Sequence, residues 1–239
     1  MLFLRSLLFN LGLWGSTVLF ALLTPLLFPF PYAVRFNIIK GYALFNVASL
    51  RLLCGVKYEV EGLENLPPGP AIFLAKHQSA WETLAFQKFF PPHSWVLKRE
   101  LIWIPFIGWA LWMLRAIAID RSAGRKALKL LVEKGKSRLQ QGQWLMIFPE
   151  GTRVPPGSRG TYHQGGAVLA TKTGYPVVPV AHNAGQFWPR QSFIKYPGTV
   201  RVIVGPPIES KGISSSALTR QVEEWIEERM VEITEISRH

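Results

Sequence analysis

The chain has 239 residues, enough for one sizeable domain with accessory segments. Hydrophobic residues make up 49% of it, charged residues only 18%, and the formal net charge is +12. This composition suits a membrane surface, phosphate-bearing substrates or nucleic acid, but no nucleic-acid-binding motif is present, so we expect no nucleic-acid partner. Cys54 is the only cysteine, which excludes an intrachain disulfide and fits a reducing compartment.

The N-terminal segment is apolar and contains no acidic residue before Glu59. Residues 7–24 would form a helix of about 27 Å at ~1.5 Å per residue, close to the ~30 Å thickness of the hydrocarbon core of a bilayer. Residues 36–53 are also apolar, but Lys40 and Arg51 make a second full span less favourable. We therefore predict a two-helix membrane anchor over residues 1–56, and both an interfacial hairpin and a single span remain open.

After residue 56 the sequence alternates between strand-like and helix-like patterns. Strands are predicted at 57–62, 71–76, 94–98, 116–120, 144–148, 176–181 and 199–205. Helices are predicted at 82–90, 124–142, 165–174 and from about 215 to the C-terminus, the last one amphipathic. This alternation predicts an α/β fold in which a partly parallel mixed sheet is flanked by helices, with one domain over residues 57–239.

One segment does not fit that alternation. Residues 102–114 are uncharged and contain three tryptophans. The segment is too short to span a bilayer, so it belongs either to the core or to a membrane-facing surface, where tryptophan is favoured.

Several classes of site are excluded by the motifs. The chain has no G-x-S-x-G sequence, no glycine-rich dinucleotide fingerprint and no complete P-loop. Its five histidines have neither metal-ligand spacing nor cysteine partners. We therefore expect no metal and no bound cofactor.

The remaining polar motifs follow two predicted strands. "HQSAWE" (77–82) comes after the strand at 71–76, and "FPEGTR" (148–153) begins at the end of the strand at 144–148. Ligands of α/β sheets bind beyond the carboxyl ends of strands, where Arg121 also lies, and guanidinium groups suit a phosphate. The alternative is that Glu150 and Arg153 form a local ion pair that stabilises the turn.

His77 and Glu82 form a His-x4-Glu motif. On a regular helix their side chains would lie about 140° apart and could not meet. However, Ser79 and Glu82 match a capping box, in which the serine binds the third helical amide and the glutamate reaches back. That arrangement leaves His77 before the helix, so that its imidazole can meet the carboxylate.

Together these motifs resemble the glycerolipid acyltransferase family, and most closely its bacterial 1-acyl-sn-glycerol-3-phosphate acyltransferases. The resemblance rests on His-x4-acid, "KRELIWIPFIG" (98–108), "IAIDR" (117–121), "FPEGTR" and "VVPV" (177–180), in order over about residues 57–206. Two positions depart from the family. Glu82 replaces the usual aspartate, and His163 stands where many relatives have a lysine.

The resemblance implies residue roles. His77 would be the general base and Glu82 its orienting acid, while the substrate phosphate would be bound by Arg121, Glu150, Gly151, Thr152 and Arg153. The reaction would be direct acyl transfer from acyl-CoA or an acyl carrier protein to the sn-2 hydroxyl of a membrane lysolipid. Imidazole titrates near pH 6.5 and suits a base working at neutrality.

The resemblance also implies a place for the protein, the inner (cytoplasmic) membrane with the catalytic domain facing the cytoplasm. The N-terminus resembles the membrane-dipping helices of these enzymes. Two alternatives remain open: an acyltransferase acting on another lysolipid, such as a lysophospholipid or a lyso-ornithine lipid, and a non-enzymatic basic membrane-binding protein.

Overall fold

A seven-stranded mixed sheet organises the chain in the computed structural model, which describes residues 1–104 and 107–234. The strands are β1 (Val56–Glu61), β2 (Ile72–Ala75), β3 (His93–Lys98), β4 (Ile117–Ile119), β5 (Trp144–Ile147), β6 (Val177–His182) and β7 (Gly198–Val204). Their order is β1-β7-β6-β2-β5-β3-β4, and all pairs are parallel except β6–β7. The predicted fold class is confirmed, and each predicted strand lies within one residue of the observed one.

Burial explains why these segments form strands. The central strands β2, β5 and β6 are covered on both faces and are continuous apolar runs, as parallel strands require. β7 and β1 lie at one end of the sheet and alternate between buried and more exposed residues. A continuous apolar run in the sequence therefore marks a central strand of the sheet, and an alternating pattern marks a strand near its end.

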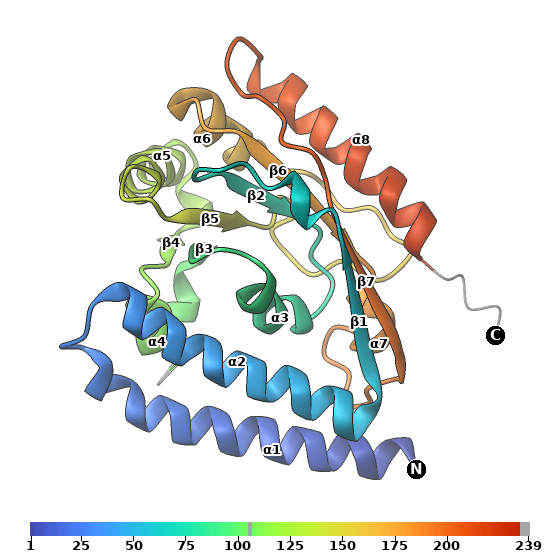
Figure 1. Cartoon of the computed structure of the whole chain (residues 1–239). Helices are drawn as coiled ribbons and strands as arrows, with labels where there is room; N and C mark the ends of the chain where they lie inside the picture. Colours follow the sequence, from blue (N-terminus) through green and yellow to red (C-terminus); the bar gives the residue numbers. More distant parts are fainter. Residues whose placement is uncertain (105–106, 235–239) are drawn as a thin grey trace.

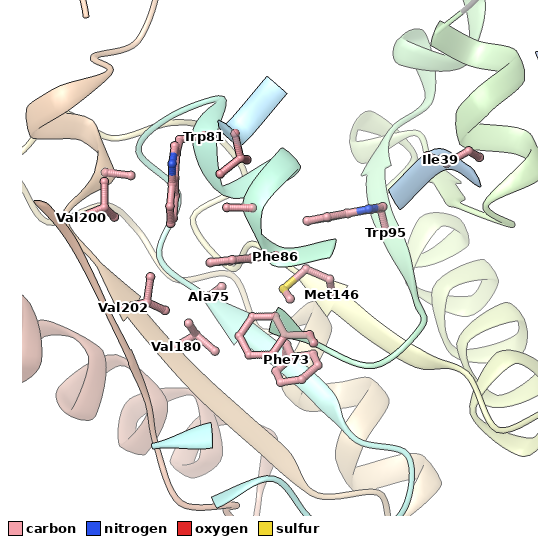
Figure 2. Close-up of a cluster of buried hydrophobic side chains, with 14 of the residues drawn as sticks. Ile39, Phe73, Ala75, Trp81, Phe86, Trp95, Met146, Val180, Val200 and Val202 are labelled. Carbon is pink, nitrogen blue, oxygen red and sulfur yellow. The ribbon is translucent and has the colours of Figure 1, made fainter. Parts of the chain in front are cut away.

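Helices cover both faces of the sheet (Figure 1). They are α1 (Leu2–Leu23), α2 (Tyr32–Cys54), α3 (Trp81–Phe89), α4 (Ile107–Met113), α5 (Arg125–Gln140), α6 (Gly165–Thr173), α7 (Ala184–Phe187) and α8 (Ser215–Ile233), with short 3-10 turns at 24–27, 63–65, 99–103 and 121–123. Side chains of α1 to α4 share one hydrophobic cluster with one face of the sheet, and those of α5, α6 and α8 share a second cluster with the other. Figure 2 shows part of the first cluster, including Phe73, Trp81 and Phe86.

The two N-terminal helices are present, but they differ in character. Among the described residues only Leu2–Leu27 is long and apolar enough to cross a membrane. α2 instead buries one face, including Phe36, Ile39 and Leu50, in the cluster that also contains α3. It ends at Cys54, and the left-handed φ of 72° at the following Gly55 lets the chain turn from the helix into β1.

The tryptophan-rich segment 102–114 combines both predicted alternatives in its described part; residues 105–106 lie outside the described residues. A 3-10 turn (Arg99–Trp103) leads towards α4. Met113 and Leu114 are buried in the core, whereas Trp103 and Trp112 are 78% and 56% exposed. The segment is therefore amphipathic, with a core face and an outward aromatic face.

We predict that acid destabilises the protein through His93 at the start of β3. Burial lowers the pKa of His93 from 6.5 to about 4, although its ring also contacts the carbonyl of Pro91. Because the unfolded chain then binds the proton more tightly, stability is lost as pH falls from 6.5 towards 4, by about 3 kcal/mol in total at ~1.4 kcal/mol per pH unit.

The measurement is the free energy of unfolding in detergent between pH 6.5 and 4.5, for the wild type and for His93→Gln. The variant should show a shallower slope, because it has lost the titrating group. Equal slopes for the two proteins would contradict the assignment.

Candidate active site

His77 and Glu82 meet in the loop between β2 and α3. The His77 Nδ1 atom lies 2.9 Å from Glu82 Oε1. The same carboxylate oxygen accepts hydrogen bonds from the backbone N–H groups of Gln78 (3.0 Å) and Ser79 (2.8 Å). His77 precedes the helix and Glu82 lies in its first turn, as the spacing argument predicts.

The start of α3 differs from the predicted capping box in one respect. The prediction that Ser79 binds the third helical amide is wrong, because its Oγ accepts from the Trp81 N–H (3.1 Å) and donates to the Trp188 carbonyl (2.7 Å). The helix consequently begins at Trp81. Ser79 thus fastens the loop between β2 and α3 to a segment more than one hundred residues away, while the glutamate half of the box is formed as predicted.

The environment of Glu82 favours its ionised form. Its side chain is fully buried, which alone would raise its pKa, but the imidazoles of His182 and His77 and the Ser79 N–H lower the pKa below its ordinary value. An ionised carboxylate can only accept hydrogen bonds, so it selects the His77 tautomer with the proton on Nδ1. The Nε2 atom is then left with a lone pair, as a general base requires.

The ring of His77 is also held from the second motif. It stacks on Phe148 with ring centroids 3.9 Å apart and an interplanar angle of 9°. The His77 carbonyl accepts from the Val154 N–H (2.8 Å), and its own N–H donates to Glu150 Oε2 (2.9 Å). The two motifs singled out in the sequence therefore form one interlocked unit.

Glu150 does not contact the pocket, contrary to its predicted place among the phosphate-binding residues. Its side chain is fully buried, and its Oε1 forms an ion pair with Lys76 Nζ at 2.8 Å. The alternative of a turn-stabilising pair between Glu150 and Arg153 is not observed among the described residues, because Lys76 is the partner. The structure instead makes Glu150 a positioning residue for the backbone of His77.

Lys76 joins this unit to the C-terminal helix. Its ammonium is wholly buried and also lies 2.8 Å from Glu227 Oε1 of α8 and 3.2 Å from the Ser158 carbonyl. Tyr162 donates to the same Glu227 oxygen (2.7 Å), and burial together with Glu150 and Glu227 raises the pKa of its hydroxyl, which keeps the proton on it. Sequence reasoning missed this cluster because its members lie up to 151 positions apart.

A pocket of about 790 Å³ opens beside His77. Its polar end contains Gly151 and Thr152 and four basic side chains: Lys98, Arg121, Arg153 and Arg190. The structure thus gathers His77 and the predicted residues 121 and 151–153 around one space. Lys98 was visible in the quoted "KRELIWIPFIG" stretch, whereas no sequence signal marked Arg190.

The FPEGTR loop is shaped by close backbone approach at Gly151. Its φ is +69°, and an added Cβ would lie 2.9 Å from the Arg121 guanidinium and 3.4 Å from the His163 ring. The guanidinium donates a hydrogen bond to the Gly151 carbonyl. Glycine is therefore required for both conformation and space, and His163 lies at the edge of this loop.

The other end of the pocket is apolar. Its walls come from α1, α2, α3 and α4, and from the ends of β3, and include Leu13, Phe20, Ile39, Leu84, Leu97, Leu111 and Leu114. A ligand that fills the whole pocket must therefore carry a negative charge at one end and a hydrocarbon chain at the other.

We predict that Lys76→Met destabilises the fold strongly, by about 3–5 kcal/mol, because it leaves the carboxylates of Glu150 and Glu227 without their buried partner. The double variant Lys76→Met/Glu150→Gln should recover part of the loss. The matched control is Lys129→Met on α5, whose exposed pair with Glu133 (3.8 Å) contributes ~0.5 kcal/mol or less. Denaturant unfolding in detergent measures all three, and equal losses for Lys76→Met and Lys129→Met would refute the role of the cluster.

Comparisons with known proteins agree with this geometry. The family model described as Acyltransferase matches residues 57–183. The chain is 46% identical over 228 residues to the 1-acyl-sn-glycerol-3-phosphate acyltransferase of Pseudomonas aeruginosa, covering 94% of this chain and 87% of that protein. It is 30% identical over 186 residues to the human 1-acyl-sn-glycerol-3-phosphate acyltransferase alpha, covering 74% of this chain and 66% of that protein.

The fold also matches a solved structure. The crystal structure of the 1-acyl-sn-glycerophosphate acyltransferase PlsC from Thermotoga maritima superposes with a TM-score of 0.78 at 27% identity, covering 97% of each chain. With the family match over more than half of its length, and with a relative 46% identical along nearly all of it, this chain belongs to the acyltransferase family.

Proposed function

We propose that this chain is a 1-acylglycerol-3-phosphate O-acyltransferase. It transfers an acyl group from acyl-CoA or an acyl carrier protein to the sn-2 hydroxyl of 1-acyl-sn-glycerol 3-phosphate and produces phosphatidic acid. The observation that carries the proposal is the His77–Glu82 pair, 2.9 Å apart, beside a pocket that is cationic at one end and apolar at the other. The names of the relatives from Pseudomonas aeruginosa and human support the acceptor.

His77 acts as the general base in this mechanism. Its Nε2 takes the proton of the acceptor hydroxyl as that oxygen attacks the thioester carbonyl of the donor. The new C–O bond forms, the C–S bond breaks, and the departing thiolate receives the proton from the imidazolium. Glu82 retains the proton on Nδ1 and offsets the transient positive charge of the ring.

The polar end of the pocket binds the acceptor phosphate. Arg121 and Arg153 supply guanidinium groups for bidentate contacts, Thr152 supplies a hydroxyl, and Gly151 lets the loop backbone approach. Arg190 and Lys98 add positive charge at the same rim. The apolar end takes hydrocarbon chain, which contributes affinity through burial.

The protein associates with membranes through its N-terminal helix, and we propose that this helix lies along the bilayer surface. Three polar contacts support this orientation: Lys195 N–H to Ser6 Oγ (2.9 Å), Lys195 Nζ to Asn10 Oδ1 (3.1 Å) and Asn10 Nδ2 to the Phe193 carbonyl (3.0 Å). They hold the first half of α1 along the catalytic domain. We place the enzyme on the inner (cytoplasmic) membrane with the catalytic domain in the cytoplasm, where soluble thioester donors are available.

We predict that His77→Ala and Glu82→Gln each lower turnover by about 10²–10⁴-fold, because one removes the base and the other removes the charge that orients it. Glu82→Gln should leave stability nearly unchanged, since its amide oxygen still accepts the two backbone hydrogen bonds. Ser79→Ala provides the contrast: it loses the hydrogen bonds to Trp81 and Trp188, costs about 1–2 kcal/mol of stability and retains most turnover. Thiol release and thermal unfolding measure both quantities. Near-normal turnover of His77→Ala would refute the mechanism.

We further predict that Arg153→Met raises KM for 1-acyl-sn-glycerol 3-phosphate much more than it changes kcat, because it removes a ground-state contact to phosphate. The assay screens that acceptor against other lysolipids, including a lysophospholipid and a lyso-ornithine lipid, with acyl-CoA and acyl carrier protein donors. Arg220→Met, an exposed position on α8 outside the pocket, is the control. Equal use of a lyso-ornithine lipid, which has no phosphate, would refute the proposed acceptor.

A further inference from the structure

Exposed aromatic side chains gather around α4 and the turn between α1 and α2. They are Phe28, Trp103, Trp109 and Trp112, with exposed fractions of 62%, 78%, 47% and 56%, and we call them the aromatic ledge. Exposed tryptophan is unusual on a surface that faces only water, and three tryptophans on one short segment form an apolar patch that calls for an occupant.

The ledge is one structure built from two separate parts of the chain. The rings of Phe28 and Trp112 are parallel within 2°, with centroids 5.7 Å apart. Pro25, Phe28, Trp109, Trp112 and Met113 line a shallow cavity of about 460 Å³ between the α1–α2 turn and α4. The segment around α4 is thereby joined to the end of the helix that associates with membranes.

The opposite face of α4 forms a wall of the substrate pocket. Ile107, Ala110 and Leu111 line that pocket, and the following Leu114 does so as well. One short helix therefore separates the space beside His77 from the aromatic ledge. Whatever covers the ledge lies one helix thickness from the apolar end of the active site.

The surroundings of the ledge fit lipid. The exposed leucines 19, 22, 23 and 26 add apolar surface at the end of α1 and in the turn that follows it. The nearby α2 carries Arg35 and Lys40, and no acidic residue precedes Glu59, so this side of the chain is attracted to anionic lipid. Tryptophan is enriched at the headgroup level of membranes, where its ring is buried and its N–H can be solvated.

We propose that the aromatic ledge is a second membrane contact, which inserts into the bilayer interface beside α1 and holds the α4 wall of the pocket at that depth. This inference rests on the proposed function in one respect, that the acceptor is a membrane lipid. The ledge then fixes the orientation of the enzyme about the long axis of α1, because one helix alone leaves that rotation free.

Brominated lipids, which quench tryptophan fluorescence within the bilayer, test the contact. The full-length wild type and the double variant Trp103→Phe/Trp112→Phe are reconstituted into vesicles of zwitterionic and anionic lipid, with and without brominated acyl chains. The double variant should lose a large part of the quenchable emission, because two interfacial fluorophores have been removed. The control is Trp225→Phe on α8, on the opposite face of the sheet, which should lower the total emission and leave the quenchable part unchanged.

Two outcomes would overturn the proposal. One is the same quenchable intensity in the double variant as in the wild type, which would place the ledge in water. The other is shielding of the ledge from both brominated lipid and a water-soluble quencher, together with a doubled mass in detergent, which would make a second copy of the chain its occupant.

Neither variant changes a residue of the pocket, so both should keep acyl transfer in micelles. An unchanged quenchable intensity in the double variant, with activity intact, would refute the ledge alone, and the expected drop in quenching without any acyltransferase activity in the wild type would refute the proposed function alone.

Discussion

The arrangement of the site depends on two contacts of the Glu150 carboxylate. One of its oxygens binds the buried ammonium of Lys76, and the other accepts the N–H of the next residue, His77. A single buried group thus fixes the end of β2 against the FPEGTR loop and sets the position of the backbone at His77. Burial raises the pKa of Glu150 even with Lys76 beside it, so the contact holds only while the lysine, with Glu227 behind it, stays in place. The energetic cost of burying these charges explains why α8 is needed to complete the cluster.

The glutamate of the His-x4-Glu motif uses its extra length within the loop. Its Oε1 gathers two backbone N–H groups and the His77 imidazole at one point, between 2.8 and 3.0 Å from each. One carboxylate oxygen in the first turn of α3 therefore holds both the backbone of the preceding loop and the ring of His77.

Much of the fold could be predicted from the sequence, because each strand of the sheet shows a local hydrophobic pattern. The buried runs of β2, β5 and β6 and the apolar face of α8 follow from local hydrophobic patterns, and the meeting of His77 and Glu82 follows from the capping-box pattern, which leaves His77 before the helix. Contacts between distant segments could not be predicted. From the sequence alone, Lys76 would be taken for an exposed lysine beside a histidine. No residue near it in the sequence indicates that Glu227 is its ion-pair partner. The same holds for the hydrogen bond between Ser79 and Trp188, which joins the loop before α3 to the end of α7.

The two N-terminal helices and the α/β fold share one hydrophobic cluster. Phe9 of α1 and Leu50 of α2 belong to the same buried cluster as Phe73 and Val180 of the sheet. Leu13 and Ile39 also line the pocket that contains His77. In the proposed function, a hydrocarbon chain bound there contacts these two helices and the α/β core at the same time. The apolar side chains of the N-terminus therefore form part of the core and part of the pocket wall, and in the proposed function they also hold the protein at the bilayer.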